Sequence, residues 1–254
     1  MHLLFRFLRQ YQSFTVLPRQ TCLTFSSFPS FPDEHFYEPS SSQGHGLRNN
    51  PFNSIISPRP IGWISSQGSN GNVNLAPYSF FNCFNYHPPI IGFSSIGWKD
   101  TVKNCSETGE FTWNLATKKL GEGVNTSCEP VGPEVNEYEM SGLTEVPSNI
   151  VAPPRVGESP VNFECKVTQI EQLRNAQGEE VGTWMILGEV IGVHISKELI
   201  RDGVYDSLLA EPLLRGGGPA DYYTITRDNL FQIHRRHGHL EDPSIDEKDI
   251  PNPL

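Results

Sequence analysis

The chain of 254 residues lacks several features that would define common protein classes. No apolar run approaches the ~18 residues that a membrane-spanning helix needs, so no membrane partner is expected. Lys and Arg are not clustered and the net charge is −10, which argues against a nucleic-acid partner. The five cysteines are widely spaced and form no Cys-x-x-Cys pair, so neither a disulfide framework nor a zinc site is expected. We therefore expect a soluble protein with reduced cysteines.

The fingerprints of common nucleotide, hydrolase and metal sites are also missing. Neither a Gly-x-Gly-x-x-Gly fingerprint nor a Walker P-loop occurs. Residues 92–97 approach a nucleophile elbow, but the second Gly comes one residue too late. The His-rich run 234–239 holds two adjacent arginines and no carboxylate, which disfavours a metal. No metal site and no catalytic residue are predicted from these motifs.

Composition favours a loop-rich β architecture with a tail at each end. Gly 22 and Pro 21 are abundant, while charged residues make only 19% of the chain. We expect one domain over 51–232, an N-terminal extension over 1–50 and an acidic tail over 233–254. Residues 1–32 lack acidic residues, carry three Arg and place apolar residues on one helical face. This pattern is typical of a mitochondrial transit peptide, with a disordered N-terminus as an equal alternative, so the expected location is cytoplasmic or mitochondrial.

Hydrophobic patterning predicts mainly strands. The alternation in residues 161–168 and the long apolar run 183–195 predict a hairpin that closes a barrel, because closure removes an exposed edge. Asp100 is the expected N-cap of a helix over 101–107, with Gly109 just past its end. His194, on the second strand of the hairpin, is either a proton source or a satisfied structural group. Further strands are expected at 61–65, 73–78, 90–94 and 110–115.

Two groups of residues suit a phosphorylated, planar ligand. Ser94, Ser95, Lys99 and Thr101, with Arg59 as a second cation, offer the hydroxyls, helix start and positive charge that a phosphate needs. The alternative is that the serines only end a strand and Asp100 only caps a helix.

The second group is the run Asn74-Leu75-Ala76-Pro77-Tyr78-Ser79-Phe80, which mixes amide and hydroxyl groups with an aromatic ring. A flavin or nicotinamide ring needs flat apolar contact and a few polar partners of this kind. The alternative is a core strand end whose polar groups are satisfied within the protein.

Several ordered motifs together resemble the flavin reductase-like, FMN-binding split-barrel family over roughly residues 51–231. They are Arg59-Pro60-Ile61-Gly62-Trp63-Ile64-Ser65, Asn74-Leu75-Ala76-Pro77-Tyr78-Ser79-Phe80-Phe81-Asn82, Pro88-Pro89-Ile90-Ile91-Gly92-Phe93-Ser94, Lys99-Asp100-Thr101-Val102-Lys103-Asn104, Val151-Ala152-Pro153-Pro154-Arg155-Val156 and Gly188-Glu189-Val190-Ile191-Gly192-Val193-His194-Ile195.

The resemblance implies a Greek-key split β-barrel with a few short helices, a homodimer and one FMN per subunit. By position, Asn74, Ala76, Tyr78 and Ser79 would lie along the flavin, and Ser94, Lys99, Asp100 and Thr101 at its phosphate. The implied activity is hydride transfer from NADH or NADPH to the flavin and onward to an acceptor. Two alternatives stay open, a non-enzymatic FMN-binding electron carrier and a flavin-free dimeric interaction module.

Overall fold

The computed structural model describes residues 33–233, and the chain divides into two compact units, Met1–Arg48 and Asn49–Leu254. In the first unit the described residues form turns, held by contacts such as that between His35 Nε2 and the His45 carbonyl oxygen at 2.8 Å. The transit-peptide prediction for 1–32, the His-rich run and the acidic tail lie outside the described residues, save for position 233.

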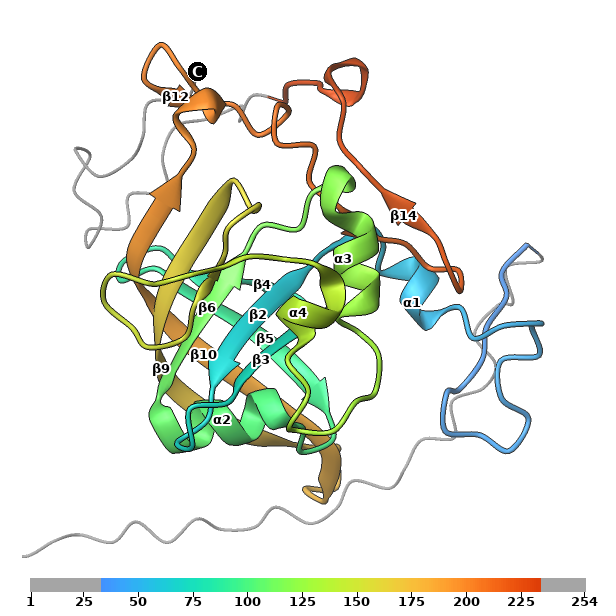
Figure 1. The fold of residues 1–254 in the computed structure, drawn as a ribbon. Helices are drawn as coiled ribbons and strands as arrows, with labels where there is room; N and C mark the ends of the chain where they lie inside the picture. Colours follow the sequence, from blue (N-terminus) through green and yellow to red (C-terminus); the bar gives the residue numbers. More distant parts are fainter. Residues whose placement is uncertain (1–32, 234–254) are drawn as a thin grey trace, which may run out of the picture. The chain divides into compact units, whose positions relative to one another are not determined.

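A seven-stranded antiparallel sheet dominates the second unit. Its strands run in the order β3 (Val73–Tyr78), β2 (Gly62–Gln67), β6 (Glu110–Asn114), β9 (Val161–Arg174), β10 (Glu180–Ile195), β5 (Ile90–Ile96) and β4 (Phe81–Asn85). The sheet curls into an open half-barrel (Figure 1), which brings the end of β3 back toward β5. The backbone N–H of Ser94 there donates to the carbonyl of Phe80 at 2.9 Å. The expected mainly β barrel is confirmed.

The long hairpin β9–β10 has a different place from the one expected. It forms as predicted, with a turn at 175–179 in which Gly178 has φ +84°. It does not close the barrel, however, because β6 pairs with the outer side of β9 and β5 with the outer side of β10. The pair is central, so its backbone groups are satisfied by neighbouring strands and the sheet edges fall on β3 and β4 instead. Strand β4 was not expected from the sequence.

Within residues 49–233, four short helices and several small elements complete this unit. Helix α2 (Asp100–Thr108) packs at one end of the half-barrel against β2 and β3, while α3 (Gly121–Thr126) and α4 (Glu137–Ser141) lie over the outer face of β3 (Figure 1). The remaining elements are α1 (Phe52–Ile55), the 3-10 turns Lys118–Leu120, Lys197–Leu199 and Arg227–Asn229, and the two-residue strands β1 (Arg59–Pro60), β7 (Glu145–Val146), β8 (Arg155–Val156), β11 (Ile200–Arg201), β12 (Val204–Tyr205), β13 (Leu214–Arg215) and β14 (Tyr222–Tyr223).

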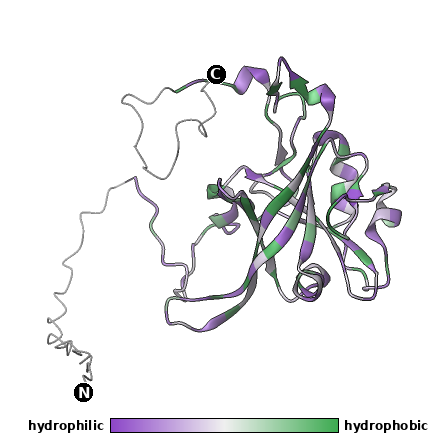
Figure 2. Cartoon of the chain, turned by 90° about the vertical axis from the view of Figure 1, so that its left-hand side faces the viewer, coloured by the Kyte–Doolittle hydropathy of each residue, from purple (hydrophilic) through white to green (hydrophobic). Residues whose placement is uncertain are grey.

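Apolar side chains form two cores, one on each face of the sheet. Ile64 and Phe93 belong to the core inside the half-barrel, whereas Trp63 and Tyr138 belong to the core between the sheet and α3–α4. Trp63 and Ile64 are neighbours on β2 and point to opposite faces, as strand geometry requires. Apolar and polar residues accordingly alternate along the long strands (Figure 2). Burial on both faces holds β2 and β3 in place beside α2.

Helix α2 begins one residue earlier than a cap at Asp100 would place it. Lys99 is the N-cap, with extended backbone (φ −92°, ψ 172°) and no side-chain cap hydrogen bond, and Asp100 is the first helical residue. The carboxylate therefore lies in the first turn, where the helix dipole favours a negative charge. Gly109 ends the helix with φ +71°, as predicted. None of the helices within 33–233 is long and apolar enough to cross a membrane.

Candidate functional site

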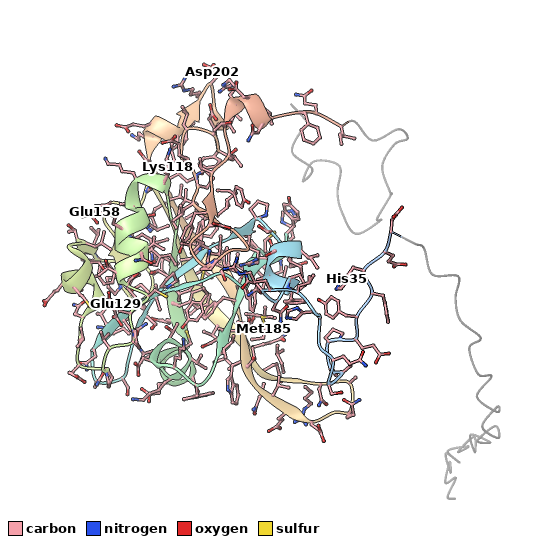
Figure 3. The ribbon with its side chains drawn as sticks, turned by 90° about the vertical axis from the view of Figure 1, so that its right-hand side faces the viewer. His35, Lys118, Glu129, Glu158, Met185 and Asp202 are labelled. Atoms are coloured by element: carbon pink, nitrogen blue, oxygen red, sulfur yellow. The ribbon has the colours of Figure 1, made fainter. Side chains whose placement is uncertain are left out.

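A cavity of about 320 Å³ opens where β3, the first turn of α2 and the connection between α3 and α4 meet. Its walls include Ser127, Cys128, Glu129, Pro130, Val131 and Glu137, and Figure 3 labels Glu129 on the segment that follows α3. Seven of the residues predicted from the sequence line it: Asn74, Ala76, Pro77, Tyr78, Lys99, Asp100 and Thr101.

The β3 wall combines a proline with a buried phenol. Pro77 is tolerated because β3 is an edge strand, bonded only to β2 in the sheet order. Tyr78 is 7% exposed and packs on Phe93, with ring centroids 4.7 Å apart. Burial raises the pKa of Tyr78 to about 12, although the nearby hydroxyls of Thr101 and Ser95 oppose the rise. The phenol therefore stays neutral at ordinary pH, and its oxygen has no hydrogen-bond partner within the described residues.

The helix wall supplies backbone donors and one cation. The first N–H groups of α2 have no partner inside the helix, which makes its start a natural place for an anion. Lys99 is exposed and makes no ion pair within residues 33–233. Thr101 is only 1% exposed, and its Oγ1 lies 2.8 Å from the side-chain amide of Asn74. An anion at this corner would meet a lysine, a helix start and a hydroxyl.

Glu137 on α4 is a cavity residue that the sequence did not indicate. It is 7% exposed, and its Oε2 accepts the backbone N–H of Leu75 at 3.1 Å. Burial raises the pKa of Glu137 and the negative charge of Asp100 adds to the rise, while the Leu75 N–H opposes it. Its Oε1 lies 3.2 Å from the amide of Asn74. Sequence patterns could not place it, because it lies about sixty positions from β3 in a segment without clear periodicity.

Four predicted residues do not line the cavity. Arg59 is 8% exposed and donates to the carbonyl oxygens of Asn53 and Ile56 through Nη1, Ser79 through Nε and Gly216 through Nη2. Ser79, Ser94 and Ser95 are likewise absent from the walls.

The two serines of β5 are held inside the fold. Ser94 is 9% exposed and Ser95 is fully buried, with its Oγ donating to the carbonyl of Gly97 at 3.0 Å. His194 lies elsewhere, on a hollow of about 630 Å³ that shares no residue with the first cavity.

Comparison with known proteins agrees with this architecture. Residues 55–213 match the family described as flavin reductase like domain. A protein of Halalkalibacterium halodurans is 37% identical over 169 residues, which cover 64% of this chain and 80% of the relative.

Two solved structures are similar in fold. Nitrilotriacetate monooxygenase component B from Bacillus cereus is 26% identical, with a TM-score of 0.66, over 74% of this chain and 98% of that one. A flavin reductase with a split-barrel domain from Shewanella frigidimarina is 24% identical, with a TM-score of 0.64, over 72% and 89% of the two chains. The half-barrel is therefore a split barrel, and this chain belongs to the flavin reductase-like family.

Proposed function

We propose that this protein is an FMN-binding oxidoreductase of the flavin reductase type. The observation that carries the proposal is the cavity at the start of α2, which Lys99, Thr101 and Tyr78 line together and where the buried Tyr78 hydroxyl has no partner among residues 33–233. A buried hydroxyl without a partner costs about 1–3 kcal/mol, and a bound ligand would remove that cost. Membership of the flavin reductase-like family supports flavin as that ligand.

In this proposal the protein orients the cofactor. Lys99, the Thr101 hydroxyl and the first N–H groups of α2 hold the phosphate, while Asn74, Ala76, Pro77 and Tyr78 lie along the remainder of the flavin. The flavin itself supplies the capacity to accept a hydride from NADH or NADPH and pass electrons to an acceptor. Similarity to a protein named component B of a monooxygenase favours a partner enzyme or free flavin as that acceptor.

We also propose that two copies associate through the edge of the half-barrel at β4. Phe84, Tyr86 and Val193 are 55%, 81% and 54% exposed around an apolar hollow of about 380 Å³. An edge strand next to exposed apolar side chains is a surface that soluble proteins usually cover. The double variant Phe84→Ser, Tyr86→Ser is expected to sediment as a monomer. Leu173→Ser, at the far end of β9, is the matched control and is expected to leave the dimer intact.

The first test is the visible spectrum of the purified protein, before and after NADH or NADPH is added without oxygen. A flavin spectrum that bleaches is the expected result. A flavin spectrum indifferent to both nucleotides would indicate an electron carrier. A protein that neither carries nor takes up flavin would overturn the proposal and favour an interaction module.

The proposed phosphate contacts are tested by comparing FMN with riboflavin, which lacks the phosphate. The double variant Lys99→Ala, Thr101→Val is expected to weaken FMN binding by at least tenfold and riboflavin binding much less. Equal weakening of both ligands would show that the phosphate lies elsewhere.

A further inference from the structure

Three side chains form a row along the wall of the cavity. The amide of Asn74 lies between Oγ1 of Thr101, at 2.8 Å, and Oε1 of Glu137, at 3.2 Å. An amide presents a donor on one side and an acceptor on the other. Reversing the Asn74 amide therefore reverses the direction of every hydrogen bond in the row. Which direction holds depends on whether Glu137 carries a proton.

With Glu137 ionised, both of its oxygens only accept. The amide nitrogen of Asn74 then donates to Oε1, and the amide oxygen accepts the hydroxyl hydrogen of Thr101 and the N–H of Leu75, the latter at 3.3 Å. In this state the hydroxyl hydrogen of Thr101 is already engaged in the hydrogen bond to Asn74. Thr101 then presents only oxygen lone pairs to the cavity, and these cannot donate a hydrogen bond to an anion.

With Glu137 protonated, the row runs the other way. Oε2 still accepts the N–H of Leu75 at 3.1 Å, so the proton belongs on Oε1, which faces Asn74. The carboxylic acid donates to the amide oxygen, and the amide nitrogen donates to Oγ1 of Thr101 at 2.8 Å. The Thr101 hydroxyl is then free to donate into the cavity.

The charges around the cavity also favour protonation of Glu137 when an anion binds. Protonation removes one negative charge from a site in which carboxylates outnumber the single lysine, and burial of Glu137 already raises its pKa. The other charged and titratable groups that line this cavity are Tyr78 on β3, Lys99 and Asp100 at the start of α2, and Cys128 and Glu129 on the segment after α3. Lys103, one turn further along α2, lines a neighbouring hollow that shares Asn74 and Asp100 with this cavity.

We propose that Glu137 couples binding of the FMN phosphate to uptake of one proton, by reversing the Asn74 amide and releasing the Thr101 hydroxyl as a donor. The inference rests on the proposed function. The balance is simple: the carboxylate takes a proton from solvent as the phosphate binds, and no electron moves. Glu137 acts here as a positioning residue, since Thr101 and not Glu137 contacts the phosphate.

The test compares the pH dependence of FMN and riboflavin binding by fluorescence quenching between pH 5.5 and 8.5. In the wild type, the preference for FMN over riboflavin is expected to fall by up to tenfold per pH unit once Glu137 ionises. The phosphate itself titrates near pH ~6 and becomes more negative as pH rises, an effect common to all variants. The readout is therefore the difference between wild type and variant.

Glu137→Gln is expected to remove this fall and keep FMN binding tight, because its amide donates to Asn74 permanently as the protonated acid does. Glu129→Gln is the matched control, since it removes one charge from the same cavity without touching Asn74. It is expected to shift FMN affinity evenly across the pH range and to retain the wild-type slope.

Proton uptake gives a second readout that does not depend on the Gln variant folding. In weakly buffered solution near neutral pH, the wild type is expected to take up a proton on binding FMN but not on binding riboflavin. Thr101→Val is expected to lose that difference. FMN binding with the same pH slope in wild type and Glu137→Gln, or without proton uptake, would overturn the coupling alone. Absence of any flavin binding would overturn the proposed function with it.

Discussion

Nε2 of His194 lies 2.5 Å from Oε1 of Glu164, and this fully buried carboxylate also accepts the backbone N–H groups of Asn149, Ile150 and Val151. Burial alone would raise the pKa of Glu164, but these donors outweigh it and lower the pKa to about 2. The pair joins the loop before β8 to β9 and β10. Between the two alternatives for His194, this contact favours the structural one.

Stability should therefore fall in acid. The depressed pKa means that Glu164 contributes its full stabilisation above its unfolded pKa of about 4.3 and loses it as pH falls toward about 2. Glu164→Gln is expected to cost roughly 2 kcal/mol at pH 7, the scale of a buried hydrogen-bonded charge, and to flatten the acid slope. Urea unfolding at several pH values measures both. Glu171→Gln, exposed on the same strand, should change neither, and a wild-type slope in Glu164→Gln would refute the assignment.

Gly188 on β10 is required by close packing inside the half-barrel. A Cβ at this position would overlap the ring of Phe111, with its Cζ only 2.6 Å away, and Phe111 is fully buried. Gly188→Ala is expected to destabilise the protein by about 1–3 kcal/mol, as overpacked cores do. Gly182→Ala, on the same strand with no atom within 4 Å, should stay within about 0.5 kcal/mol of wild type. Thermal unfolding of the pair decides the matter.

Arg59 should matter for stability and not for the phosphate. Four of its five N–H donors reach carbonyl oxygens, and a lysine cannot reproduce this planar arrangement. Arg59→Lys is expected to lower the free energy of unfolding by roughly 2 kcal/mol while FMN affinity stays unchanged. Lys99→Ala should show the opposite pattern. A selective loss of FMN over riboflavin affinity in Arg59→Lys would restore Arg59 as a phosphate ligand.

Substitution of Tyr78 should affect stability and flavin affinity differently. Its hydroxyl is buried without a partner within the described chain, so Tyr78→Phe is expected to leave the ligand-free protein as stable or up to about 1 kcal/mol more stable. Flavin affinity should fall several-fold, because the ligand loses a hydrogen-bond partner. Unfolding without ligand and flavin titration measure the two effects separately. A loss of stability without a loss of affinity would mean that the hydroxyl serves the fold.

Much of the fold could be predicted from the sequence because the relevant signals are local. The alternation from Val161 onward and the apolar run before Ile195 reflect which face of each strand is buried. Gly109 ends α2 because its positive φ favours glycine. Seven of the cavity residues lie on two short segments, Asn74 to Tyr78 and Lys99 to Thr101. Each segment could be recognised in the sequence because its residues are consecutive or nearly so.

The sequence alone determined the long strands other than β4, the start and end of α2 to within one residue, and the family resemblance, since each depends on residues that are close along the chain. Only the tertiary structure decided the order of strands and the central position of the β9–β10 hairpin. It also decided that the Arg59 guanidinium donates to backbone carbonyl oxygens and does not line the cavity. It also brought Glu137 beneath Asn74 and placed Glu164 under three backbone donors. Those arrangements depend on contacts between distant segments, whose pairing is set by packing across both cores and leaves no local pattern in the sequence.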